Sequence, residues 1–557
     1  MGTWLYLLTF SDTDTFPTLF LLTYQLQCHK RILDLEVLRN GIVEMSAVLG
    51  PILQSSWQTT ASVSALAGVL SHHTVFRRYE IDGNAWDLVF AYIGLFIALC
   101  IGYVQIAGLG LFASLCRTLL DATTYNVSLT ASILIYRAFF HRLRSFPGPF
   151  MAKLSRFYLL WTVAKTNRGC EDIQRLHKKY GTIVRIGPRE LSINLPPAIP
   201  LIYGWSDKIT KSPWYGQVSN DITEISLNST RDPKAHKERK VLWGKAFGSK
   251  CFSKDFGMLK GKTEHPAIKG VHESMMAIGV LGTVPWLLSM LGKIPGAAGG
   301  YTRFTRWCHE QLQETRKIRT SLKDQDPQDI MSYLLRAKED GESCAPPGDK
   351  AMEEDARLVI IAGSDTVASA ITNVFYHLAK NPDCYQALQD AMWQHFPNGG
   401  SEWTYEKVRA VPYLDWVINE SLRLRPPVPG GLTRVTPPEG LWVDDVFIPG
   451  DTVISVPTYT MQRDENYWSD ALSFKPERWK GLSTKNTPYI PFTRGQGYCP
   501  GEPLAMMEMR MVVGLIALRY NISFPEGVDA KAVELPFEDY FTQKPGPLHL
   551  VFTPASR

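Results

Sequence analysis

The chain has 557 residues, of which 45% are hydrophobic and 20% charged, and its net charge is +5. This composition is ordinary for a globular protein, and so small and dispersed a charge argues against a nucleic-acid-binding function. The nine cysteines are widely spaced and form no CxxC pair, which indicates free thiols in a reducing compartment and no structural zinc site. Motifs of nucleotide folds and common hydrolases (GxGxxG after a strand, GxxxxGK[ST], GxSxG, HExxH) are absent from the sequence.

Residues 1–145 predict a membrane anchor with one to three transmembrane helices. From Leu88 to Cys116 the chain runs for 29 residues without a charge or a histidine. As one helix, this run is longer than the roughly 30 Å of hydrocarbon in a bilayer, so we expect it to cross the membrane. Met45 to Ser71 and Ala122 to Tyr136 are also uncharged, and each is either a further span or a buried helix of a soluble unit.

Positive charge follows the last of these stretches. Arg137, His141, Arg142 and Arg144 favour the cytosolic side of a membrane, so we expect residues 146–557 to face the cytosol. The segment FPGP at 146–149 predicts a stiff kink between the anchor and this second domain.

Residues 146–557 predict one large, mostly helical domain with small sheets. Two short strands are expected around IVRI (183–186) and in the stretch GPREL and SIN (187–194), and further strands from about 440 to 456. Residues 353–380 predict one long helix, and another helix follows Pro503.

A single cysteine, Cys499, stands in the stretch PFTRGQGYCPGEPLA, where Phe492, Gly495 and Gly501 complete the spacing FxxGxxxCxG. A thiolate is a good ligand for iron, and it is stabilised by backbone N–H groups and by the N-terminus of the helix that follows. The glycines allow the backbone to approach a flat, bulky ligand. The alternative for a lone cysteine is a buried, unreactive side chain.

One acidic and one basic residue precede this loop at a fixed spacing. Glu420 and Arg423 lie three residues apart on one helical face, where they can pair. Alone, they indicate a surface ion pair of small energetic value. Because Arg478, in the segment PERW, and then Cys499 follow in this order, the surface pair is no longer the best interpretation.

The segment AGSDT (362–366) lies in the middle of the long predicted helix. Its alanine and glycine leave a hollow, and the Thr366 hydroxyl can take a backbone carbonyl out of the helical ladder and bend the helix. Asp365 and Thr366 could pass protons to a small ligand in that hollow. The alternative is a helix with one glycine and an exposed aspartate.

Together and in this order, the motifs resemble those of the cytochrome P-450 superfamily of haem-thiolate monooxygenases, and most of all its fungal membrane-bound members of secondary metabolism. The resemblance implies a mainly α fold with small β-sheets, preceded by N-terminal transmembrane helices. It implies that Cys499 is the axial thiolate ligand of the iron of heme b, an iron protoporphyrin IX. Glu420, Arg423 and Arg478 correspond to the buried structural triad of the family.

The same resemblance assigns the remaining site residues. Asp365 and Thr366 correspond to the distal pair that delivers protons to dioxygen. Phe492, Gly495 and Gly501 belong to the cofactor-binding loop. Arg434 corresponds to an arginine that pairs with one haem propionate, and His236 and Lys240 occupy the place of residues that reach the other.

The chain departs from the family pattern in two places. Gly497 stands where most members have Arg or His, and Arg494 either compensates for it or faces a redox partner. Between Phe247 and Ala362 only 114 residues remain for a long series of family helices, so part of the helical core between about 248 and 262 is expected to be missing. Either an exon is lost from the sequence or the domain has a depleted core.

The activity implied by the resemblance is insertion of one oxygen atom of O2 into a lipophilic small molecule at the endoplasmic reticulum membrane. Electrons would come from NADPH through NADPH-cytochrome P-450 reductase, with cytochrome b5 as a further donor, and Lys485, Arg494 and Arg510 are candidate contacts for an acidic partner. Two alternatives stay open. One is a truncated, weakly active or non-catalytic haem-binding membrane protein; the other is a haem-thiolate isomerase or dehydratase. The intact pair of Asp365 and Thr366 argues against a non-catalytic protein and against an isomerase or dehydratase, and a truncated, weakly active chain stays an alternative.

Overall fold

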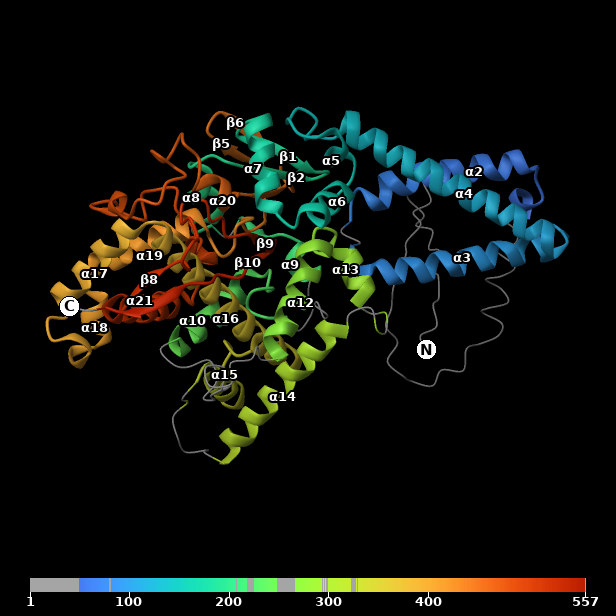
Figure 1. Cartoon of the computed structure of the whole chain (residues 1–557). Helices are drawn as coiled ribbons and strands as arrows, with labels where there is room; N and C mark the ends of the chain where they lie inside the picture. The colour runs from blue at the N-terminus through green and yellow to red at the C-terminus, as the bar shows by residue number, and fades with distance from the viewer. Residues whose placement is uncertain are drawn as a thin grey trace. The chain divides into compact units, whose positions relative to one another are not determined.

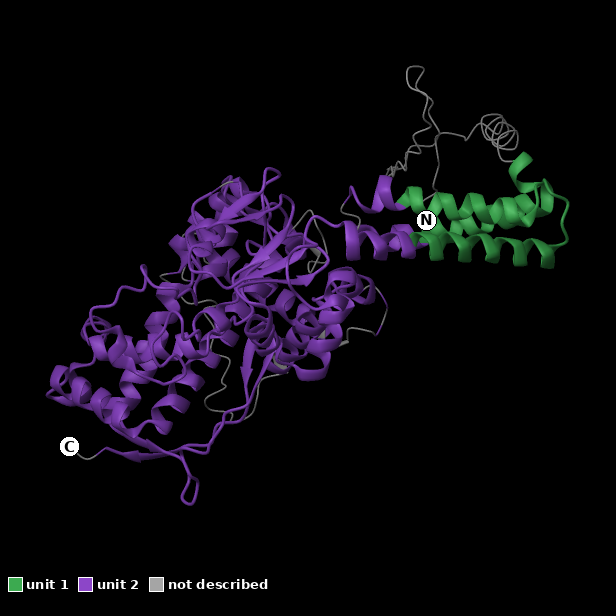
Figure 2. Ribbon diagram, turned by 90° about the horizontal axis from the view of Figure 1, so that it is seen from above, with its two compact units in different colours: residues 1–71, 90–129 green, residues 72–89, 130–557 purple. Residues whose placement is uncertain are grey.

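The computed structural model describes residues 50–79, 82–206, 208–217, 225–247, 266–292, 299–321 and 329–555, together with residues 294, 296 and 327. The chain divides into two compact units (Figure 2). The first comprises residues 1–71 and 90–129, and the second comprises residues 72–89 and 130–557. We describe each unit by itself.

The first unit is built from the helices α2 (Trp57–Ser71), α3 (Ala85–Gln105) and α4 (Leu111–Ile135) (Figure 1). The prediction of one helix from Leu88 to Cys116 is wrong, because this run is shared between α3 and α4. Gly108 has a φ of 66°, the left-handed conformation that glycine adopts just after a helix end. The stretch from Ala122 to Tyr136 forms the second half of α4 instead of a separate span.

Among the residues that the structure describes, two helices are long and apolar enough to cross a membrane by length and composition. One is α3, and the other is α16 (Asp349–Lys380) of the second unit. Because α16 packs against α14 (Gly299–Ser321), α19 (Pro412–Leu424) and α21 (Glu502–Arg519), it is the central helix of a folded domain.

The second unit is mainly helical. Its long central helix confirms the helix predicted over residues 353–380, and α21 confirms the helix predicted after Pro503. The other α-helices in the described part of the unit are α5 (Phe150–Leu154), α6 (Phe157–Thr166), α7 (Gly169–Tyr180), α8 (Ala198–Tyr203), α9 (Trp214–Gln217), α10 (Pro233–Ala246), α12 (Pro266–Leu281), α13 (Pro285–Gly292), α15 (Ile330–Glu339), α17 (Pro382–His395), α18 (Tyr405–Arg409) and α20 (Thr458–Met461).

The sheets are small, as predicted. A five-stranded sheet has the order β1-β2-β7-β4-β3, in which only β2 and β7 are parallel. The strands predicted near 183, near 190 and from 440 to 456 are confirmed. The five-stranded sheet contains β1 (Ile183–Gly187), β2 (Glu190–Ile193), β3 (Thr210–Lys211), β4 (Arg434–Val435) and β7 (Val453–Ser455). The two-stranded sheets pair β5 (Leu441–Val443) with β6 (Val446–Ile448), β8 (Tyr520–Ser523) with β11 (Val551–Pro554), and β9 (Phe537–Tyr540) with β10 (Thr542–Pro545).

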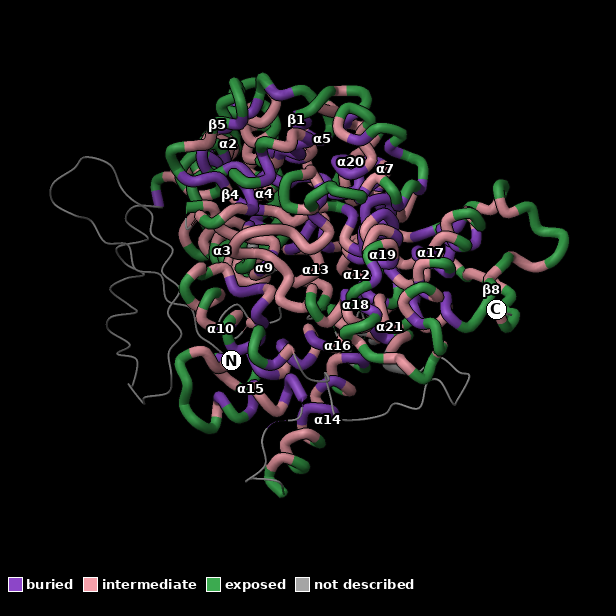
Figure 3. Tube along the Cα trace, turned by 90° about the vertical axis from the view of Figure 1, so that its left-hand side faces the viewer, coloured by how far each residue is buried: buried purple, intermediate pink, exposed green. Residues whose placement is uncertain are grey.

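The largest apolar core lies among α16, α17, α19 and α21. Figure 3 shows the buried residues gathered around α19. Leu414, Val417 and Ile418 of this helix are fully buried, so packing fixes this face of α19. The expected gap in the helical core between about 248 and 262 lies outside the described residues.

A buried arginine fixes the segment that enters this domain. Arg185 in β1 has no exposed surface, and its guanidinium donates to the carbonyl oxygens of Pro188 (2.8 Å) and Leu143 (3.4 Å). Gly148, in the predicted kink, passes close beside it. A Cβ at Gly148 would lie 2.2 Å from the carbonyl oxygen of Arg185, so only glycine fits there.

Candidate active site

The carboxylate of Glu420 is the centre of a buried polar network. Arg423 donates to both of its oxygens, from Nε at 2.9 Å and from Nη2 at 2.9 Å, and neither side chain has any exposed surface. A surface ion pair, the alternative for these two residues, is therefore excluded. Because a buried charge is costly unless it is paired and hydrogen-bonded, the network must be nearly complete for the domain to fold.

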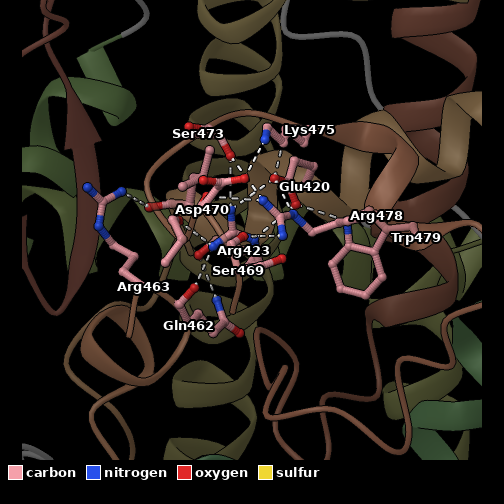
Figure 4. A network of polar contacts seen from close by, with 12 residues as sticks. Glu420, Arg423, Gln462, Arg463, Ser469, Asp470, Ser473, Lys475, Arg478 and Trp479 are labelled. Carbon is pink, nitrogen blue, oxygen red and sulfur yellow. Dashed lines mark hydrogen bonds and ion pairs between the residues drawn. The ribbon is translucent and has the colours of Figure 1, made fainter. Parts of the chain in front are cut away.

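The segment after β7 supplies the other donors to Glu420 (Figure 4). Arg478 Nε donates at 2.8 Å, and Trp479 Nε1 at 3.1 Å. The backbone N–H of Lys475 donates at 2.9 Å. The predicted association of Glu420, Arg423 and Arg478 is thus present in the structure. Trp479 was not predicted as a member, although its place next to Arg478 in the segment PERW is a usable signal.

Arg423 also holds the backbone of this segment. Its Nη1 donates to the carbonyl oxygens of Gln462 and Ala471, both at 2.7 Å. Gln462, fully buried, donates to the carbonyl of Leu422 (3.1 Å) and accepts from the N–H of Ile490 (2.8 Å). The network therefore reaches the residue just before the cysteine loop, defined here as residues 491–501. Sequence reasoning missed Gln462, because its partners are backbone groups distant in sequence.

Cys499 is half-buried and keeps part of its accessible surface. Its N–H donates to the carbonyl of Phe492 at 2.9 Å, which closes the loop, and α21 begins three residues later. Burial raises the pKa of the Cys499 thiol, and the backbone N–H of Gly501 acts in the opposite direction. The predicted backbone stabilisation of a thiolate is present, but burial outweighs it.

The two glycines of the predicted spacing play different parts. Gly495 has a φ of 60°, and a Cβ there would lie 2.2 Å from the carbonyl oxygen of Tyr203. Gly495 therefore lets the loop pass close to the backbone after α8. A Cβ at Gly501 would meet Phe247 only at 3.5 Å, an ordinary contact.

A cluster of basic side chains lies beside the cysteine loop. We call Lys211, His236, Lys240 and Arg434 the basic cluster. Lys240 Nζ donates to the carbonyl of Gln496 at 2.9 Å, and it lies 4.4 Å from the ring centre of Tyr498. Lys211, which sequence reasoning missed, donates to the carbonyl of Asn228 at 2.7 Å. Lys211, His236, Arg434 and Gly497 line one small cavity of about 40 Å³.

The electrostatics of the basic cluster favour an anion. Burial lowers the pKa of Lys240 to about 8 and that of Lys211 well below its usual value. Burial, together with the positive charges of Lys211, Lys240, Arg434 and Arg239, lowers the pKa of His236 to about 3. Several buried cations that repel one another are stabilised when a negative group lies among them.

Arg434 occupies the space beside Gly497. Its guanidinium is buried, lies 5.3 Å from the ring centre of Tyr203 and donates to the hydroxyl of Tyr215 at 3.4 Å. A Cβ at position 497 would lie 2.5 Å from Arg434 Nη2. The glycine that departs from the family pattern is thus the residue that makes room for this arginine.

Two other cations are engaged within the domain. Arg494 Nη2 donates to the carbonyls of Thr487 (2.6 Å) and Thr484 (2.9 Å), so this nitrogen is engaged within the domain, and the two roles considered for Arg494 stay predictions. Arg510 forms a two-pronged ion pair with Asp415, at 2.7 and 2.9 Å. Of the three cations considered for an acidic partner, Lys485 is the exposed one.

The middle of α16 carries Asp365 and Thr366. Thr366 Oγ1 donates to the carbonyl of Ala362 at 2.7 Å, as predicted, and the helix continues through this position to Lys380. Ala362 is exposed although it lies in the central helix, which indicates open space beside it.

Asp365 has different partners from Thr366. Its carboxylate accepts from the hydroxyl of Thr542 in β10 and lies 3.7 Å from His272 Nε2 in α12. Burial raises the pKa of Asp365, while Thr542, His272 and Lys544 lower it in part. Asp365, His272 and Lys544 line a cavity of about 540 Å³.

Comparison with known proteins agrees with this arrangement. The Cytochrome P450 family model matches residues 244–552. "Cytochrome P450 monooxygenase FCK2" of Fusarium pseudograminearum is 34% identical over 88% of this chain and 97% of its own length. "Cytochrome P450 monooxygenase eupD" of Phoma sp is 46% identical over 50% of this chain and 100% of its own length. "Tryprostatin B 6-hydroxylase" of Aspergillus fumigatus is 30% identical over 84% of this chain and 91% of its own length.

The chain belongs to the cytochrome P450 family and is a cytochrome P450 monooxygenase. The family implies a haem held by a thiolate, and the residues present fit that group. Cys499 keeps accessible surface, Ala362 of α16 is exposed, and the positive charge of the basic cluster suits the acidic edge of a haem.

Replacing Glu420 by Gln should strongly lower the unfolding temperature of the domain. Arg423, Arg478 and Trp479 would then share a neutral acceptor, and breaking a buried ion pair costs about 3 to 5 kcal/mol. Thermal unfolding of the purified protein measures the loss. Glu439→Gln is the matched control, because Glu439 pairs with Lys208 on the surface. Equal unfolding temperatures for the two variants would contradict the assigned importance of Glu420.

Restoring a side chain at position 497 should weaken haem retention. In Gly497→Ala the new Cβ displaces the guanidinium of Arg434, and Gly497→Arg displaces it further. We expect a several-fold faster transfer of haem to an acceptor protein than from the unmodified chain. Gly244→Ala is the control, since a Cβ at Gly244 in α10 meets nothing within 4 Å. Slower haem loss from Gly497→Arg would show that Arg434 does not need this space.

Proposed function

We propose that Cys499 is the axial thiolate ligand of heme b and that the enzyme hydroxylates or epoxidises a lipophilic small molecule of fungal secondary metabolism. The observation that supports the proposal is that Cys499 keeps accessible surface in a loop that Lys240 contacts and that begins next to Ile490 of the Glu420 network. The identities of the relatives support the metabolic context, because they are fungal P450 monooxygenases. Conversion of the substrate consumes dioxygen and two electrons.

The residues that would hold the cofactor come from several separate segments. Phe492, Gly495 and Gly501 shape the cysteine loop that presents Cys499. Arg434 of β4 and Lys240 of α10, with the added Lys211 of β3, would bind the carboxylates of the cofactor. When bound, the haem supplies activation of dioxygen, from which one oxygen atom enters the substrate and the other becomes water.

On α16, Asp365 and Thr366 would handle protons. Burial raises the pKa of Asp365, so its carboxyl binds a proton more readily than an exposed aspartate. The cavity lined by His272 and Lys544 gives this carboxyl contact with solvent. The Thr366 hydroxyl, which donates to the carbonyl of Ala362, can turn to donate to a ligand in the space beside Ala362. Proton transfer from solvent to the site would then use both side chains.

Electrons would come from NADPH through NADPH-cytochrome P-450 reductase, with cytochrome b5 as a second donor. The sequence carries no flavin or nicotinamide motif, which supports a separate donor. Lys485, exposed before the cysteine loop, is the candidate contact for an acidic partner.

The location would be the endoplasmic reticulum membrane, with the catalytic domain in the cytosol. Residues 1–145 would form the membrane anchor. The length and hydropathy of α3 support this location, and the arginines that follow α4 support the orientation.

The carbon monoxide difference spectrum of the reduced protein in microsomes tests the proposed axial ligand. We expect the unmodified chain to give the red-shifted Soret band of thiolate-bound haem and Cys499→Ala to lose it. Cys344→Ala, at a partly exposed cysteine after α15, is the control and should keep the band. Absence of the band from the unmodified chain would contradict the proposal. If a version with added family helices then shows the band, a missing part of the helical core would explain its absence from the unmodified chain.

Thr366→Ala should keep the haem and divert reducing equivalents to peroxide. The variant keeps Cys499 and the Glu420 network but loses the hydroxyl that hands on the proton. We expect a several-fold rise in hydrogen peroxide formed per NADPH oxidised in a system reconstituted with the reductase. Thr372→Ala, one and a half turns further along α16, is the matched control, since its hydroxyl donates to Ala368. An unchanged peroxide yield in Thr366→Ala would contradict the assignment of proton delivery to Thr366.

A further inference from the structure

The helices of the first unit expose apolar side chains along most of their length. In the most apolar window of α3 the mean hydropathy is 2.1, and only 6% of that window is buried. Large apolar side chains of all three helices are exposed: Leu66, Leu70, Phe90, Leu95, Ile97, Ile101, Leu111, Phe112, Leu119 and Val127. Contiguous exposed apolar surface of this extent is typical of a surface that contacts a membrane or another protein.

The interior of the unit is polar. Tyr103 of α3 is buried, and its hydroxyl donates to the carboxylate of Asp121 in α4, also buried, at 2.5 Å. Arg117 of α4 donates to Thr60 Oγ1 of α2 at 3.0 Å and to the carbonyl of Ser55 at 2.8 Å. We call Thr60, Tyr103, Arg117 and Asp121 the polar cluster. An apolar exterior around a polar interior is the reverse of a water-soluble helical bundle.

The contacts fix how the three helices run. Gln54, just before α2, donates to the carbonyl of Ile106, so α2 begins beside the turn at 106–110 that joins α3 to α4. Between residues 88 and 136, Arg117 and Asp121 are the only Lys, Arg, Asp or Glu residues in the sequence, and both belong to the polar cluster. The other charges near these helices, at 77, 78, 87 and 137, lie at the helix ends away from that turn.

We propose that α2, α3 and α4 form one membrane-embedded unit whose apolar exterior contacts the hydrocarbon of a lipid bilayer. In it, α3 and α4 cross the bilayer as a hairpin, with the turn at 106–110 on the lumenal side and the charged ends on the cytosolic side. The 21 residues of α3 span about 31 Å, close to the roughly 30 Å of hydrocarbon. Because lipid gives no hydrophobic drive for helix association, the polar cluster holds the helices together.

This inference deepens the proposed membrane location and rests on it. Epitope tags inserted after Gly108 and after Gly83 test it, since a Cβ at either glycine meets nothing within 4 Å. In sealed microsomes treated with protease, we expect the tag after Gly108 to survive and the tag after Gly83 to be digested. Detergent should expose both. Digestion of both tags without detergent, or release of the protein by alkaline extraction, would overturn the inference.

Tyr103→Phe tests the polar cluster. It removes the donor to Asp121, so the helices should separate more readily, and we expect the lifetime of the N-terminal fragment under protease in mild detergent to fall at least threefold. Tyr92→Phe is the control, because the Tyr92 hydroxyl accepts from Asn126 at the surface. Equal lifetimes for the two variants would overturn the role of the polar cluster. The carbon monoxide spectrum of each tagged protein is recorded in parallel. If the haem band is absent while the tag after Gly108 is still protected from protease, the result counts against the proposed function and not against the membrane hairpin.

Discussion

The catalytic domain depends on one buried carboxylate. Glu420 receives hydrogen bonds from two arginines, a tryptophan and a backbone N–H, and these donors come from segments up to 59 residues away. A charge so far from water is tolerated only when all its partners are in place. Helix α19, the segment around Arg478 and, through Gln462, the start of the cysteine loop therefore become ordered together. The position of Cys499 is in this sense set by a residue that takes no part in the chemistry.

The basic cluster shows the opposite situation, because its charges are not balanced by one another. Lys211, His236, Lys240 and Arg434 face the same small region and depress the protonation of His236. Such an arrangement is electrostatically unfavourable unless a negative group lies among these side chains. A ligand with acidic groups placed there would relieve the repulsion.

The sequence predicted the features that depend on local pattern. The long helix α16, the short strands and the pairing of Glu420 with Arg423 follow from periodicity and spacing. The break at Gly108 was missed because uniform hydropathy on both sides of a turn carries no period that ends there. Gln462, Lys211 and the internal use of Arg494 were not foreseen, since their partners are backbone carbonyls or N–H groups brought close only by the fold. Trp479 was visible in the sequence, but its donation to Glu420 was not.

The contact between Gly497 and Arg434 couples two positions that are 63 residues apart. A Cβ at 497 requires the end of the Arg434 side chain to move, whereas a shorter side chain at 434 leaves space next to the loop. A change at either position therefore alters the surroundings of the other, although the two are far apart in the sequence.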